Sequence, residues 1–158
     1  MVTIDQVTNY ILNKLQGASY PVNPLKLQKL LYYVQAWHFA FFKEPLTECK
    51  FQAWTHGPVN YEVFCRFRGN YGMYDAIQGS EIPADYKEDV IPYRKRQHID
   101  NVLEAYGQFS AVQLESLTHA EDPWLAARKG IPEGESGSEE IDEKLMGDCY
   151  RARLERKK

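Results

Sequence analysis

The fold of this chain is decided by residues 25–59, which read LKLQKLLYYVQAWHFAFFKEPLTECKFQAWTHGPV. Asn23 and Pro24 come just before this stretch, and these residue types are favoured at the N-cap and the first position of a helix. Apolar side chains then recur at helical spacing and cover most of the circumference, which is typical of a central helix packed on several sides. The pattern predicts such a helix over residues 24–42, ended by Pro45.

In the second half of this stretch, the spacing of the apolar residues changes from helical to alternating. Between residues 48 and 54, apolar and polar side chains alternate, which predicts a short strand. An isolated strand needs a partner, and residues 88–93 are the best candidate for one. Pro58 is expected to open the next helix, because proline is well tolerated at the start of a helix.

Helices are also expected on both sides of this stretch. Thr3 with Gln6, and Ser110 with Gln113, have the spacing of capping boxes. A further helix is expected to run from Glu139 to about Leu154. The sequence thus predicts a mainly α, compact single-domain helical bundle around the central aromatic helix, with a short strand or small β-hairpin. Residues 1–130 are expected to form a helical domain, and residues 131–158 an acidic linker and C-terminal helix packed on the same domain.

Composition narrows the class of protein. The chain has 158 residues, enough for one domain with a sizeable core, and its formal net charge of −3 argues against nucleic acid as the main partner. The three cysteines lack metal or disulfide spacing, which favours reduced thiols in a cytoplasmic protein. We find no signal peptide and no apolar run of the ~20 residues that a membrane-spanning helix needs, so no membrane association is expected.

The histidines are the candidates for chemistry. His56 and His119 could serve a histidine-dependent or metal-assisted enzyme, because imidazole titrates near neutral pH and binds metals. The sequence has no nucleophile elbow, no zinc-protease motif and no locally paired ligands around them, so we expect no catalytic residues, metal or cofactor. Instead, His56 is expected to hydrogen-bond the backbone of its own turn, His119 a helix end or turn, and His38 to pack in the core.

Aromatic residues are the remaining lead. The chain has eleven tyrosines and three tryptophans, more than a domain of this size can bury completely. Some are expected to form a surface patch that binds a protein partner. The candidate partner-binding residues are Tyr32, Trp54, His56, Tyr61, His119 and Trp124.

Three segments, taken in order, resemble the Panacea-domain antitoxin family, long described as phage-associated proteins. They are LQKLLYY with AWH at residues 27–38, FQAWTHGPV at residues 51–59, and LTH with PW at residues 117–124. With the first helix, the resemblance covers about residues 1–130. It supplies no catalytic residues.

The resemblance implies a cytoplasmic, mostly helical antitoxin of a toxin–antitoxin system. Such a protein would neutralise a toxin encoded by an adjacent gene through direct protein–protein binding. One alternative is a proteolytic adaptor that delivers the toxin to a protease; its motivation is the distinct segment 131–158. The second alternative is the histidine-dependent or metal-assisted enzyme.

Overall fold

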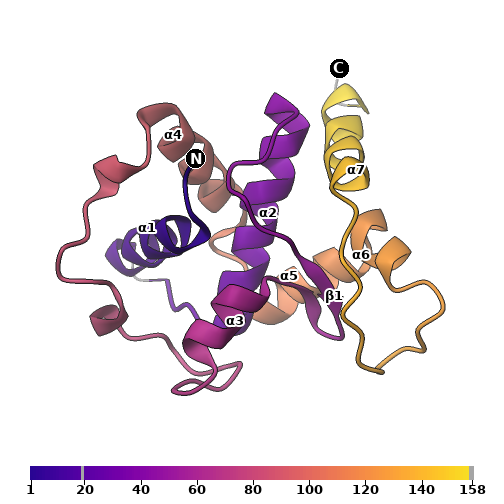
Figure 1. The fold of residues 1–158 in the computed structure, drawn as a ribbon, viewed down its shortest axis with the longest axis horizontal. Coiled ribbons are helices and arrows are strands. Elements are labelled where there is room, and N and C mark those ends of the chain that lie inside the picture. The colour runs from indigo at the N-terminus through magenta and orange to yellow at the C-terminus, as the bar shows by residue number, and fades with distance from the viewer. Residues whose placement is uncertain (19, 157–158) are drawn as a thin grey trace.

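The computed structural model describes residues 1–18 and 20–156 (Figure 1); residues 157 and 158 of the expected C-terminal segment lie outside the described residues. The fold is mainly helical, with one small antiparallel hairpin. The elements are α1 (Ile4–Gly17), α2 (Pro24–Phe42), β1 (Gln52–Trp54), β2 (Gly57–Val59), α3 (Tyr61–Phe67), the 3₁₀ turns η1 (Gly79–Glu81) and η2 (Glu88–Val90), α4 (Tyr93–Tyr106), α5 (Ala111–His119), α6 (Asp122–Ala127) and α7 (Glu143–Arg156).

The central helix is confirmed. Asn23 accepts a hydrogen bond from the backbone N–H of Lys26 at 2.8 Å, so it caps α2 as the sequence predicts. Nearly every side chain of α2 up to Ala40 is buried, because α1, α4, α5 and α7 surround it (Figure 1). Only the last turn emerges from the core, where Phe41 and Phe42 are about half exposed.

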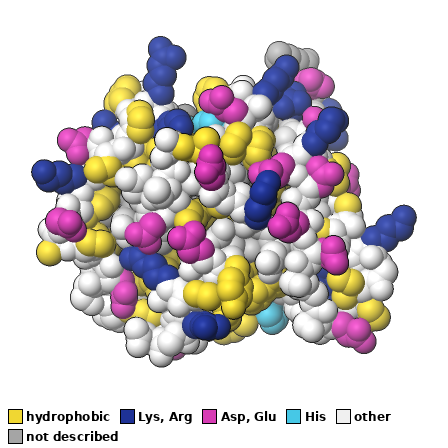
Figure 2. Space-filling view, in the orientation of Figure 1, with side chains coloured by type: hydrophobic (Ala, Val, Ile, Leu, Met, Phe, Trp, Pro, Cys, Tyr) yellow, Lys and Arg dark blue, Asp and Glu magenta, His cyan; other side chains and the backbone are white. Residues whose placement is uncertain are grey.

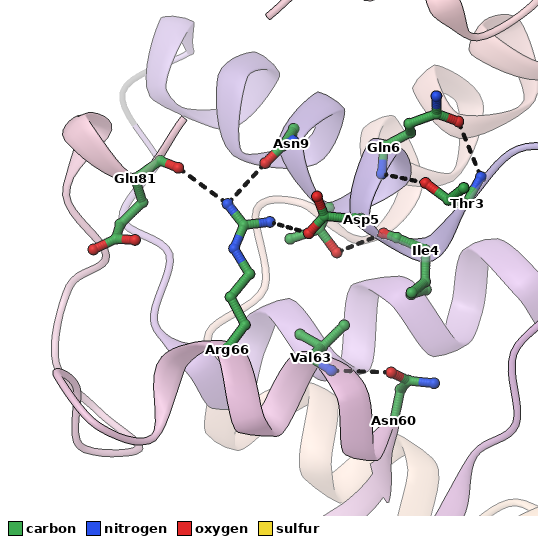
Figure 3. Close-up of polar contacts among 10 residues, drawn as sticks. Thr3, Ile4, Asp5, Gln6, Asn9, Asn60, Val63, Arg66 and Glu81 are labelled. Carbon is green, nitrogen blue, oxygen red and sulfur yellow. Dashed lines mark hydrogen bonds and ion pairs between the residues drawn. The ribbon is translucent and has the colours of Figure 1, made fainter. Parts of the chain in front are cut away.

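α1 and α3 are joined by a polar network (Figure 3). The guanidinium of Arg66 on α3 donates to Asp5 at 2.7 Å, to Asn9 at 2.8 Å and to the carbonyl of Glu81 at 3.0 Å. The capping box of Thr3 and Gln6 is present at the start of α1, as predicted. These contacts fix α3 against the outer face of α1 and η1.

The strand prediction was right about β1 but wrong about its partner. β1 pairs antiparallel with β2, with Ala53 opposite Pro58, whereas residues 88–90 form a 3₁₀ turn and a helix starts at Tyr93. The chain reverses within two residues because Gly57 adopts a positive φ of 107°. Pro58 therefore lies in a strand, and α3 starts later, where Asn60 caps it through a hydrogen bond from the N–H of Val63.

The C-terminal helix also starts later than predicted. Residues 139–141 extend along the free edge of β1, where the N–H of Ala53 donates to the carbonyl of Glu139 and the N–H of Ile141 to that of Phe51, both at 2.8 Å. α7 then begins at Glu143, after Asp142 accepts a hydrogen bond from the N–H of Leu145. Local periodicity could not distinguish these residues from a first helical turn, since a strand partner decides their conformation.

α7 packs along α2 through a buried polar network. The carboxylate of Glu121, at the start of α6, accepts hydrogen bonds from the hydroxyls of Tyr33 at 2.7 Å and Tyr150 at 2.8 Å, and forms an ion pair with Arg153. Both tyrosines are completely buried. The segment that carries α7 is therefore part of the same core. Among the described residues, no helix combines the length and the apolar character needed to cross a bilayer.

Candidate functional site

The three segments that carry the family resemblance meet at the hairpin. Lys29 of α2 donates a hydrogen bond from Nζ to the carbonyl of Pro58 at 3.0 Å. At Gly57, an added Cβ would lie 2.5 Å from Cε of Lys29 and 2.9 Å from Oγ1 of Thr118 on α5. A glycine at this position thus allows α2, the hairpin and α5 to approach one another closely.

Lys29 is completely buried, which is rare for lysine. Burial desolvates its ammonium group and lowers the pKa to about 7, while the nearby Glu115 acts in the opposite direction. Our sequence reasoning missed this residue. The sequence feature that could have identified Lys29 is the presence of a lysine within a helix that is apolar over most of its circumference.

The burial of Lys29 predicts a pH-dependent stability. Below pH 7 the lysine is protonated in both the folded and unfolded chain, but between about pH 7 and 10.5 the unfolded chain binds more protons. The contribution of Lys29 to the free energy of unfolding should therefore rise with pH across this window, by up to ~1.4 kcal/mol per pH unit. Urea unfolding at pH 7 to 9.5 should show a smaller upward slope in Lys29→Met than in the original protein.

The comparison between variants isolates Lys29, because the other titrating groups are common to both proteins. Lys129 is exposed, so Lys129→Met is the matched control and should leave the slope unchanged. Parallel profiles for the original protein and Lys29→Met would contradict the lowered pKa.

His56 lies on the surface of the hairpin turn. Its Nδ1 is 2.9 Å from Oε1 of Glu115 on α5, and about half of its side chain is exposed. The expected hydrogen bond to the backbone of its own turn is therefore replaced by a contact between side chains. His38, in contrast, is buried as predicted, and its Nδ1 is 2.7 Å from the carbonyl oxygen of Glu44.

His119 and Trp124 lie behind the hairpin. Their rings stack with centroids 3.9 Å apart, and Nε2 of His119 is buried without a hydrogen-bond partner among the described residues. The expected hydrogen bond to a helix end is therefore not made through this atom, and burial lowers the pKa of the ring. Trp124 donates from Nε1 to the carbonyl of Trp54 at 2.9 Å. Both aromatic rings thus support the hairpin from the side of α5 and α6.

An apolar groove of about 960 Å³ opens on the other side of the hairpin, between the start of α2, α3 and the loop 134–138. We call it the hairpin groove. Trp54 and His56 line it, and Tyr61, half exposed, contacts the rings of Trp54 and Phe64 at its border. Figure 2 shows hydrophobic side chains gathered over this region of α3 and the hairpin.

The sequence-predicted residues therefore fall into three groups. Trp54 and His56 line the hairpin groove and Tyr61 lies beside it, whereas His119 and Trp124 support the hairpin from behind. Tyr32 is an exception, because it is only 1% exposed and its hydroxyl lies 3.1 Å from that of Tyr150. The expectation of a surface position for Tyr32 is wrong, since α7 covers it.

The hairpin groove has a simple electrostatic character. His56 and Arg68 line it, and among the described residues no carboxylate does. Arg68 is exposed and forms no ion pair with any described residue, and its guanidinium lies over the ring of Phe64. Within residues 1–18 and 20–156, no group of three or more His, Cys, Asp or Glu side chains is arranged to hold a metal ion.

A family model described as "Antitoxin SocA-like, Panacea domain" matches residues 27–125. The chain belongs to this family. Antitoxin SocA from Caulobacter vibrioides (strain NA1000 / CB15N) is 29% identical over 154 residues, which cover 92% of this chain and 80% of that protein. No solved structure matches this chain.

The match to the Panacea domain confirms the family resemblance seen in the sequence. The matched residues contain α2 from Leu27 onward, the hairpin and α5, and therefore the whole contact between Lys29, Gly57 and Thr118. The loop 134–138 and α7 lie outside them. In this Panacea domain, the hairpin groove is thus completed by a segment beyond the family match.

Proposed function

We propose that this Panacea domain is an antitoxin that neutralises a protein toxin, encoded by an adjacent gene, through direct binding at the hairpin groove. The observation that carries the proposal is the apolar groove itself, built on a scaffold of the SocA-like antitoxin family. A groove of this kind suits the insertion of apolar side chains from a partner protein. No carboxylate of residues 1–18 and 20–156 lines the groove, and Arg68 does, which favours a toxin surface with acidic residues around its apolar centre.

The aromatic side chains at this groove are held in place before binding. Trp54 donates from Nε1 to Oε1 of Gln52 at 2.7 Å, and its ring packs edge-on against Phe64 with centroids 4.8 Å apart. Tyr61 lies against Phe64 in a stacked arrangement. A fixed aromatic surface loses little conformational entropy when a partner binds, which favours direct recognition by these residues.

Charge placed in the groove tests the proposal. Met73→Glu changes an exposed position that lines the groove, and Tyr61→Glu changes an exposed position beside its lining residues Trp54 and Phe64. Each should weaken toxin binding at least about tenfold, because it buries an unpaired carboxylate in the interface. Val112→Glu, at an exposed apolar position on α5 away from the groove, is the matched control. The measurements are calorimetric binding to the purified toxin and growth of cells that express the toxin with each variant.

The outcome is decisive in both directions. Toxicity of the adjacent gene product that this protein does not relieve would refute the antitoxin function. Relief that survives both groove variants would keep the antitoxin function and place the toxin elsewhere.

The two alternatives lead to different results in the same cells. An adaptor would lower the amount of toxin in protease-proficient cells, whereas direct blocking leaves the toxin level unchanged. The adaptor hypothesis was motivated by the distinct segment 131–158, but residues 143–156 of that segment pack against α2 with Tyr150 buried. A histidine-dependent enzyme would lose all its activity in His56→Ala, whereas blocking by the groove should lose only part of its toxin affinity, because His56 is one of many side chains that line the groove.

A further inference from the structure

We propose that this protein forms a two-fold symmetric dimer through the face made by α4 and the ends of α2 and α7. This inference concerns a second surface and does not depend on where the toxin binds. An apolar groove of about 770 Å³ lies on this face, lined by residues of α2, α4 and α7. We call it the α4 groove. Figure 1 shows the end of α2 reaching out between α4 and the end of α7.

Large apolar side chains are exposed at the α4 groove. Phe41 and Phe42 line it with 53% and 54% of their surface exposed, although the rest of α2 is almost entirely buried. Two adjacent half-exposed phenylalanines form an apolar patch that a partner would cover. The same face thus offers both protruding rings and a hollow beside them.

The floor of the α4 groove needs no further polar partner. Trp37 donates from Nε1 to the hydroxyl of Tyr106 at 2.9 Å, and Nε2 of His98 lies 2.8 Å from the carbonyl oxygen of Val34. Neither Trp37, His98 nor Tyr106 has a buried side-chain polar atom without a hydrogen bond. The floor therefore suits an apolar occupant better than a small polar ligand.

The charges on α4 identify the occupant as a second copy. Arg94 and Glu104 are both exposed, and neither forms a hydrogen bond or ion pair with any described residue. They are ten residues apart, or about 15 Å along the helix. If two copies of α4 pack antiparallel about an axis at the level of residue 99, each Arg94 meets the Glu104 of the partner copy.

The same axis pairs other exposed residues of α4 favourably. The bulky Tyr93, 64% exposed, comes opposite the small, exposed Ala105, and Gln97 comes opposite Asn101. A two-fold interface must be complementary to itself, and here charge, size and hydrogen-bonding capacity all satisfy that condition.

Sedimentation velocity of the full chain over a range of concentrations tests the dimer, because its population follows mass action. The original protein should be dimeric at about 100 µM, a concentration high enough to populate even a micromolar dimer. Arg94→Glu and Glu104→Arg should each raise the dissociation constant at least about tenfold by placing like charges in contact. The double variant Arg94→Glu/Glu104→Arg should restore the dimer, since the swap re-creates the ion pairs.

Arg68→Glu, at an exposed arginine of the hairpin groove, is the matched control and should leave the dimer intact. A monomeric original protein at that concentration would overturn the proposal, as would a double variant that dissociates as much as either single one. If the protein is monomeric and Phe41→Ser abolishes toxin binding, the α4 groove serves the toxin and the dimer is refuted. Toxin binding by the hairpin groove is measured separately, so either proposal can fail alone.

Discussion

Gly57→Val is expected to lower the free energy of unfolding by about 3–5 kcal/mol, because it combines backbone strain with a steric clash. The φ angle of Gly57 is 107°, a conformation that valine rarely adopts. The Cβ of the valine would also lie 2.5 Å from Cε of Lys29 and 2.9 Å from Oγ1 of Thr118, both shorter than van der Waals contact. Thermal and urea unfolding of the purified variant measure the loss.

The control for this variant is Gly69→Val. Gly69 does not have a positive φ, and no heavy atom lies within 4 Å of an added Cβ. Its cost should stay within about 0.5 kcal/mol, as for most surface substitutions. Equal stability of the two variants would show that the hairpin turn can relax away from Lys29.

Glu121→Ala is also expected to have a large effect, lowering the free energy of unfolding by about 2–5 kcal/mol. The substitution leaves the buried hydroxyls of Tyr33 and Tyr150 without their acceptor and removes the ion pair of Arg153. Each unsatisfied buried hydroxyl costs about 1–3 kcal/mol. Unfolding in urea measures the total, and hydrogen exchange in α7 should rise because the network joins that helix to the core.

The destabilisation caused by the unpaired hydroxyls can be separated from that caused by the lost ion pair of Arg153. In the Glu121→Ala background, Tyr33→Phe and Tyr150→Phe should each recover part of the lost stability, because each removes a polar atom that has no partner. Glu133→Ala, at an exposed carboxylate, should be nearly neutral. A loss below about 1 kcal/mol for Glu121→Ala would mean that water replaces the carboxylate without cost.

The most accurate sequence predictions concern local interactions. The Asn23 cap of α2, and the capping boxes of Thr3 with Gln6 and of Ser110 with Gln113, all form the hydrogen bonds that their spacing implies. The positions of these contacts were predictable because donor and acceptor are only three residues apart. The period of α2 likewise identified a helix buried on most sides.

The errors concern partners distant in the chain. The strand β1 pairs with β2 on one edge and with residues 139–141 on the other, and the second pairing delays the start of α7. Tyr32 is hidden because α7, more than a hundred residues later, covers it. His56 contacts Glu115, and His119 stacks on Trp124, because α5 and α6 fold against the hairpin.

By itself, the sequence determined the class of fold, the central helix and most helix starts, because periodicity and caps depend on residues close together in the chain. It also determined the family resemblance, because the order of three short segments along the chain can be read without the structure. Only the tertiary structure decided the site. It brought Lys29, Gly57 and Thr118 into contact, buried Tyr32, and opened the hairpin groove beside Trp54 and Tyr61. The physical reason is that the burial of a side chain depends on which distant segments cover it. Lys29 is covered, which lowers its pKa, whereas Tyr61 is left half exposed.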